Sequence, residues 1–69
     1  MAVIESSLSH RHLEWQHLEG VVNGNNSIDI NNVSNGAKEH LDFHDRIVKV
    51  SLGCEHLIVT TPTQCYIYK

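Results

Sequence analysis

The sequence predicts an all-β protein, an antiparallel meander with hairpins, on three observations. The last third of the chain holds three short apolar runs, which are rich in β-branched and aromatic residues and are separated by Gly53 and Pro62. The pair Asn23-Gly24 follows a further apolar stretch and is a strong hairpin signal. No apolar run reaches helical length, and short β-branched runs bounded by Gly or Pro are typical of strands.

The segment 46–69 is predicted to be a three-stranded meander. Its strands cover Ile47–Leu52, His56–Thr61 and Gln64–Tyr68. The middle run is almost continuously apolar, which implies that both faces of that strand are covered. Strands of this kind belong in a β-sandwich, or in a propeller blade that is stacked between two others.

A turn at Pro62-Thr63 fixes the register of the last hairpin. It pairs Thr60 with Cys65 and Val59 with Tyr66, and it leaves Cys54 without a partner in this hairpin. Cys54 and Cys65 should then lie farther apart than the ~7 Å between Cα atoms that a disulfide tolerates. We therefore expect two free thiols.

The first half of the chain gives weaker signals. Ala2–Glu5 is read as a short edge strand and Ser6–His10 as a loop, while His12–Val22 and Ser27–Val33 form a hairpin. A helix over Ala2–Glu19 is the alternative, because four apolar residues fall roughly on one helical face. These residues are Ile4, Leu8, Trp15 and Leu18.

The 69 residues make one small domain. It divides into a strand and hairpin (1–36), a connector (37–45) and the meander (46–69). Within the connector, Ala37–Phe43 is either one helical turn or a short strand. A chain of this size buries only about 60% of its unfolded surface, so its stability is marginal.

Composition excludes several classes of function. The net charge is −3 and the cations are scattered, whereas a nucleic-acid surface needs a clustered basic patch. No run approaches the ~20 apolar residues of a membrane span. Two cysteines are too few for a disulfide scaffold, and the start of the chain lacks a signal-peptide pattern. We therefore expect a soluble, intracellular chain that binds no nucleic acid and does not insert into a membrane.

Six histidines are many for this length and raise the alternative of a small metal-binding module. On a helix, His40 and His44 lie on one face, and Cys54 with Cys65 would complete four zinc ligands. The spacing argues against this module, since the chain has no Cys-x-x-Cys knuckle. We expect solvated surface histidines and no metal or cofactor.

No catalytic residue is predicted either. Cys54, Glu55 and His56 are adjacent, but no orienting acid or oxyanion donor accompanies them, and Cys54 is expected to be a buried structural cysteine. Asp42, Asp45 and Glu55 form no recognisable acid–base pair, and Asp45 is best explained as a turn residue. The aromatic residues are expected to lie in the core of the sheet. They are Trp15, Tyr66 and Tyr68.

Three blocks of the sequence resemble one region of the WD-repeat subunits of the intraflagellar transport B particle. The blocks are His12–Glu19, Leu41–Leu52 and Glu55–Tyr68, and together the resemblance covers most of the chain. It implies about one and a half blades of the second of two β-propellers, with Ser6–His10 as an extra loop. It also implies a chain that stops at Lys69 where the family continues into further blades.

The resemblance also implies that the chain is a non-enzymatic scaffold fragment, whose partners are other intraflagellar transport B subunits. The implied role is in cilium assembly and in transport inside the cilium. The implied location is the cytoplasm, the cilium and the ciliary base. Substitutions at Trp15, Val50 or Ile58 should then act through packing.

The fragment itself should associate with other chains. In an incomplete propeller, Gln64–Tyr68 would be an apolar edge strand, and Lys69 would be the only charged residue beside it. An unpaired apolar edge of this kind can pair with a strand of another chain. We expect the isolated chain to be molten or self-associating.

Overall fold

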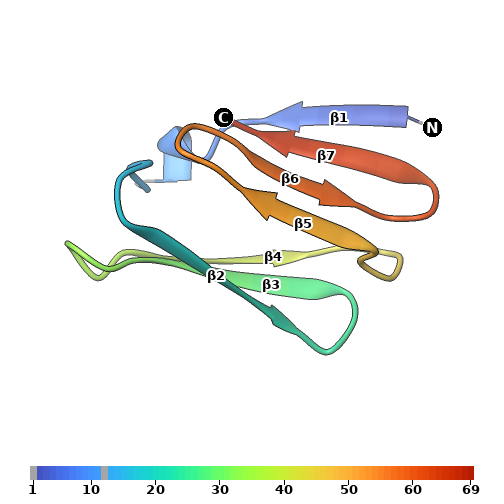
Figure 1. The fold of residues 1–69 in the computed structure, drawn as a ribbon, viewed down its shortest axis with the longest axis horizontal. Helices are drawn as coiled ribbons and strands as arrows, with labels where there is room; N and C mark the ends of the chain where they lie inside the picture. The colour runs from blue at the N-terminus through green and yellow to red at the C-terminus, as the bar shows by residue number, and fades with distance from the viewer. Residues whose placement is uncertain (1, 12) are drawn as a thin grey trace.

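A computed structural model describes residues 2–11 and 13–69 of the chain. Within these residues it contains seven strands, one short 3₁₀-helix and no α-helix, so the all-β prediction is confirmed and the helix over Ala2–Glu19 is wrong (Figure 1). The elements in order are β1 (Ala2–Ser6), η1 (Ser9–Arg11), β2 (Leu18–Asn23), β3 (Ser27–Asn32), β4 (Lys38–Asp42), β5 (Lys49–Leu52), β6 (Leu57–Thr60) and β7 (Gln64–Tyr68).

The strands form two sheets that face each other across one core. The four-stranded sheet has the order β1-β7-β6-β5, and the three-stranded sheet has the order β2-β3-β4. In Figure 1 the first lies above the second, and the molecule measures 33 × 22 × 17 Å. Both sheets contribute to the buried apolar core, which consists of Leu8, Leu13, Ile28, Ile30, Leu41, Phe43, Leu57, Val59 and Tyr68.

The predicted hairpin forms the larger part of the three-stranded sheet. β2 and β3 turn at Gly24, whose φ of 61° is in the left-handed region that glycine tolerates best. The connector supplies the third strand, because β4 pairs antiparallel with β3 and sets Leu41 opposite Ile28. Of the two alternatives for Ala37–Phe43, the strand is therefore the correct one.

Within the described residues, the first strand of this hairpin begins at Leu18, later than the predicted range His12–Val22, of which His12 lies outside the described residues. The preceding residues are held by Asn32, which is only 1% exposed. Its side-chain amide donates to the carbonyls of Glu14 and Gln16, each at 3.2 Å. Its side-chain oxygen accepts from two backbone N–H groups of the following turn. The segment before β2 is thus fixed by side-chain hydrogen bonds instead of a strand ladder.

The predicted meander β5-β6-β7 and its register are confirmed. Thr60 faces Cys65 and Val59 faces Tyr66. Both cysteines are free thiols, as expected. Leu57 and Val59 are fully buried, whereas Ile58 between them lies on the outer face and is only half-buried. Within the described chain, one face of β6 is therefore packed on the core and the other is partly open.

The predicted free edge at Gln64–Tyr68 is wrong. β1 pairs with β7 in parallel along its whole length, from Ala2 opposite Gln64 to Ser6 opposite Tyr68. The segment that follows β1 stabilises this pairing. Leu8 in that segment is fully buried, and its N–H donates to the carbonyl of Lys69 at 2.9 Å. This anchor brings the start of the chain back to the end of β7.

The link between β1 and β2 also differs in detail from the predicted loop at Ser6–His10. Ser6 belongs to β1, and Ser9–Arg11 form the 3₁₀-helix η1. Leu8 between them is a core residue, so the segment is a folded anchor for β1.

The aromatic residues lie in or against the core, as predicted. Tyr68 is 8% exposed, and Trp15 and Tyr66 are partly buried against the core cluster. The rings of Phe43 and Tyr66 meet edge to face, with centroids 4.8 Å apart. Because Phe43 follows β4 and Tyr66 lies on β7, this contact joins the two sheets.

Candidate interaction surface

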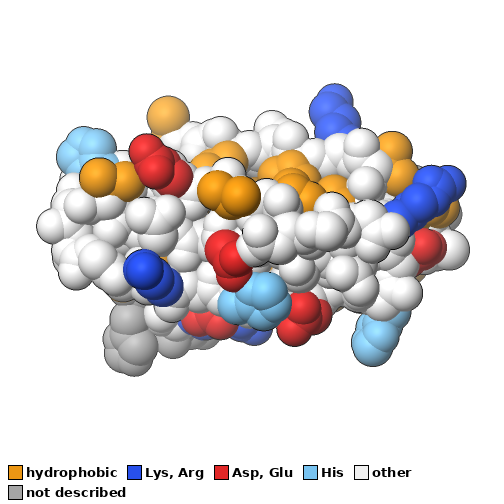
Figure 2. Space-filling model, turned by 90° about the horizontal axis from the view of Figure 1, so that it is seen from below, with side chains coloured by type: hydrophobic (Ala, Val, Ile, Leu, Met, Phe, Trp, Pro, Cys, Tyr) orange, Lys and Arg blue, Asp and Glu red, His pale blue; other side chains and the backbone are white. Residues whose placement is uncertain are grey.

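The outer face of the three-stranded sheet carries the best-defined polar cluster of the described chain. Neighbouring residues of a strand point to opposite faces, so the burial of Ile28 and Leu41 directs Asp29 and His40 outward. The register places Val21, Asp29 and His40 on one rung across the three strands. Figure 2, which views the molecule from below, shows acidic side chains flanking a histidine next to hydrophobic side chains.

His40 is bound by carboxylates at both ring nitrogens. Its Nδ1 meets Asp29 Oδ1, and its Nε2 lies 2.9 Å from Asp42 Oδ1. The amide of Asn23 donates to the other oxygen of Asp29. We call this group of four side chains (Asn23, Asp29, His40 and Asp42) the His40 cluster. It connects all three strands of the sheet through side chains.

The geometry of the His40 cluster fits a protonated ring. A neutral imidazole has one N–H, so one of its two carboxylate contacts would bring two lone pairs together. An imidazolium ion donates to both. In agreement, the hydrogen bond with Asp29 raises the pKa of His40, and the bond with Asp42 adds to the shift. Proton loss would leave two carboxylates without their cation, so the charge of this face depends on pH.

A shallow hollow of about 620 Å³ lies beside the cluster. Five of its six lining residues are polar or charged, and one of its carboxylates, Glu39, pairs with Arg11 of η1 at 3.1 Å. This ion pair joins η1 to the three-stranded sheet at the surface, where such pairs contribute about 0.2–1 kcal/mol. The lining residues are Asp29, Ile30, Asn31, Lys38, Glu39 and His40.

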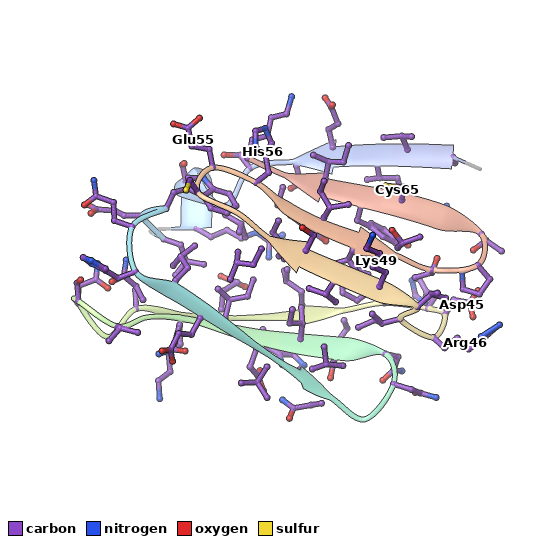
Figure 3. The ribbon with its side chains drawn as sticks, in the orientation of Figure 1. Asp45, Arg46, Lys49, Glu55, His56 and Cys65 are labelled. Atoms are coloured by element: carbon purple, nitrogen blue, oxygen red, sulfur yellow. The ribbon has the colours of Figure 1, made fainter. Side chains whose placement is uncertain are left out.

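Cys54 lies in the turn between β5 and β6 of the four-stranded sheet, whereas the His40 cluster lies on the three-stranded sheet. Gly53 N–H closes this turn on the carbonyl of His56 at 2.8 Å. Figure 3 shows Glu55 and His56 at the end of the four-stranded sheet opposite Asp45. Cys54 is exposed in this turn, so the expectation of a buried cysteine is wrong. A second hollow lies here, lined by Ser9, Glu14, Trp15, Gln16, Cys54, Glu55, His56 and Lys69.

The structure does not bring the four residues of the metal-binding alternative together. Tyr68 on β7 pairs with Leu57 on β6, and Leu57 follows the turn that contains Cys54. Cys65 lies three residues before Tyr68 on β7. At about 3.3 Å per residue, the two cysteines are roughly 10 Å or more apart along the strands. His40 lies on the other sheet, between two carboxylates. Within residues 2–11 and 13–69, no group of three or more His, Cys, Asp or Glu residues is arranged to hold a metal ion.

Asp45 is a turn residue, as predicted. Its Oδ1 accepts from the N–H of Arg46 at 2.8 Å, and its Oδ2 accepts from the Thr63 hydroxyl at 3.5 Å. Figure 3 places Asp45 and Arg46 at the connection between β4 and β5. Asp45 therefore stabilises the connection between β4 and β5, which joins the two sheets.

Comparison with known proteins gives a consistent result. The family described as IFT80 second beta-propeller matches residues 10–69. Two curated relatives are the intraflagellar transport protein 80 homologs of Rattus norvegicus and Mus musculus. Each is 32% identical over 66 residues, which are 96% of this chain and 8% of the relative. No solved structure matches the chain.

These matches agree with the fold. Six of the seven strands, β2 to β7, form two antiparallel meanders of three strands each, which are what part of a propeller would supply, and the match spans these six strands. In the described residues, no helical segment has the length and hydropathy of a membrane span. The chain corresponds to about a twelfth of the length of the relatives, the 8% given above. It belongs to the family of the second β-propeller of intraflagellar transport protein 80.

Proposed function

We propose that the chain is a non-enzymatic scaffold segment of an intraflagellar transport B subunit. It would act in cilium assembly and in transport inside the cilium, together with other subunits of the B particle. The family match over residues 10–69 is the observation that carries this proposal. We further propose that the whole chain, residues 1–69, is one incomplete propeller segment whose role depends on the rest of the subunit.

The arrangement of the polar side chains supports a structural role. Asn32 fixes the segment before β2, and Asp45 steadies the link between the sheets. The His40 cluster joins three strands at the surface. The side chains with the most developed hydrogen bonding thus act on the backbone and on each other, as expected of a scaffold.

A chimera tests the proposal. The 66 residues of the mouse homolog that match would be replaced by those of this chain, and the chimera would be expressed in mouse cells that lack their own copy. We expect cilia to form and the other B subunits to co-purify with the chimera. A chimera that is stable and soluble, but that neither co-purifies with B subunits nor restores cilia, would contradict the proposed function.

Matched variants of the chimera distinguish a scaffold role from a catalytic role. Leu57→Asp places a charge in the fully buried core and should abolish rescue by unfolding the segment. Cys54→Ser and His56→Ala change the exposed β5–β6 turn and should leave rescue intact. Loss of rescue by either turn variant, with normal amounts of folded chimera, would favour an enzymatic or ligand-binding role.

A further inference from the structure

Two asparagines of the chain stand directly before a glycine, one in each turn of the three-stranded sheet. Asn23-Gly24 begins the turn between β2 and β3, and Asn35-Gly36 lies in the turn between β3 and β4. The two turns lie at opposite ends of that sheet (Figure 1). An asparagine before glycine is prone to deamidation, because glycine has no side chain that would obstruct attack by its backbone nitrogen. The scaffold role gives no chemistry to either pair.

Deamidation joins the backbone nitrogen of the glycine to the side-chain carbon Cγ of the asparagine. The glycine N–H loses its proton to solvent, the nitrogen attacks Cγ, and the amide nitrogen takes up a proton and leaves as ammonia. One water molecule then opens the succinimide ring at either carbonyl, which gives aspartate or isoaspartate. Water is the only co-reactant. A glycine N–H that donates to a fixed acceptor is protected, because its nitrogen is held away from Cγ.

The two pairs are alike in exposure and in free space. Both asparagines and both glycines are exposed. Gly24 has a φ of 61° and Gly36 has a φ of 76°. Apart from chain neighbours, no heavy atom lies within 4 Å of the position that a Cβ would take on either glycine. Steric access therefore does not distinguish the two sites, and their hydrogen bonds must do so.

The hydrogen bonds of the β3–β4 turn fix both groups that would react at Asn35. The N–H of Gly36 donates to the carbonyl of the buried Asn32 at 2.8 Å. The side-chain oxygen of Asn35 accepts from the N–H of Ala37 at 2.9 Å. The N–H of Asn35 donates in turn to Oδ1 of Asn32 at 3.1 Å. The attacking nitrogen and the carbonyl group under attack are thus both held by the turn.

The corresponding groups of the β2–β3 turn are free. In the part of the chain that the structure describes, the N–H of Gly24 donates to no other group, and the side-chain oxygen of Asn23 accepts no hydrogen bond. The one bond of this side chain is donated by its amide nitrogen to Asp29. That nitrogen is the leaving group, and the bond lies at the surface, where water can replace it.

We propose that Asn23 is a deamidation site whose reaction weakens the end of the β2–β3 hairpin, while Asn35 is protected from the same reaction. This inference goes beyond the scaffold role and does not depend on it.

The effect on the hairpin follows from the position of Asn23 in the His40 cluster. The aspartate product has no amide hydrogen for Asp29 and brings a second carboxylate beside it, and like charges on neighbouring strands destabilise a sheet. The net charge also becomes one unit more negative than the −3 of the unmodified chain. The isoaspartate product adds a methylene group to the main chain and so disturbs the pairing of this position with Ser27.

Peptide mass spectrometry of the 69-residue chain, incubated at physiological pH and temperature, measures both sites in one sample. The same incubation in concentrated guanidinium chloride gives the rate at each site without the turns. The folded rate divided by the unfolded rate should be at least about tenfold smaller at Asn35 than at Asn23. Asn23→Ser should remove the reaction from the β2–β3 turn. Equal ratios at the two sites, or a smaller ratio at Asn23, overturn the proposal.

Two matched variants test the effect on the hairpin. Asn23→Asp mimics the aspartate product and should lower the melting temperature at neutral pH by about 1–5 °C. Asn35→Asp makes the same charge change at the other turn but keeps the oxygen that accepts from Ala37. It should change the melting temperature by less than about 1 °C. An equal or larger loss with Asn35→Asp rejects the proposed weakening of the β2–β3 hairpin.

Discussion

At the scale of single residues, His40 shows how a surface side chain can link strands and respond to pH. Both of its ring nitrogens meet carboxylates, and the imidazolium form satisfies both contacts. The pKa of His40 in the folded chain is raised above its usual value of 6.5. The contribution of this cluster to stability is therefore fully present below pH 6.5 and is lost as the pH rises through the raised pKa.

The Asp29→Asn variant tests this dependence. It removes the carboxylate that raises the pKa of His40 most, so the pKa of His40 should fall in the variant. The titration of the His40 ring can be followed by NMR in both proteins. The denaturation midpoint of the wild type should also decrease from pH 6 to pH 8 by more than that of the variant. An unchanged pKa of His40 in Asp29→Asn would contradict the hydrogen bonding of the cluster.

Asn32 is a buried polar residue with all its hydrogen-bonding groups engaged. Asn32→Asp keeps the shape but replaces the donor amide with an oxygen that faces the carbonyls of Glu14 and Gln16. We expect a loss of about 1–3 kcal/mol in the free energy of unfolding. Asn31→Asp is the control, since this neighbour lies on the outer face and should change stability by less than about 0.5 kcal/mol. Urea denaturation measures both, and equal effects would count against the role of Asn32.

At the scale of the element, β6 separates a packed face from an open one. Leu57→Ala should cost about 2–5 kcal/mol, because its side chain is fully buried in the core. Ile58→Ala should cost about 1 kcal/mol, because Ile58 lies half-buried on the outer face. Thermal unfolding of both variants gives the comparison. A larger loss for Ile58→Ala than for Leu57→Ala would mean that the outer face is covered.

Strands joined by short turns were predictable from the sequence. The turn chemistry of Asn23-Gly24 and of Pro62 fixes hairpins locally, and a turn position sets a register without knowledge of the rest of the fold. The pairing of β1 with β7 was not predictable in this way. It joins the two ends of the chain and depends on the burial of Leu8, for which the sequence around it gives no local signal.

The His40 cluster could not be predicted from the sequence for the same reason, because it depends on pairing between strands. Asp29 and His40 meet only because β3 pairs with β4, and the sequence left Ala37–Phe43 open between strand and helical turn. Helical spacing instead suggested His40 with His44 as a metal pair. The useful signal was the alternation of His40 and Asp42 around Leu41, which is typical of a strand with one buried face.

At the scale of the whole molecule, two sheets with few residues share one core. Their facing sides bury the apolar residues, and the contact between Phe43 and Tyr66 joins them directly. Their outer faces and the edge of β1 remain exposed. A segment of a propeller is expected to have such exposed faces, because each sheet of a complete propeller packs between two neighbouring sheets.

Hydrogen exchange of the 69-residue chain, resolved by residue with NMR, tests this arrangement most directly. Each of the central strands β3 and β6 has a neighbour on both sides and contributes fully buried side chains. Their amides should exchange slowest, while those of the exposed strands β1 and β2 should exchange faster. Uniformly fast exchange, or slowest exchange in β1, would contradict a fold in which two sheets close on a single core.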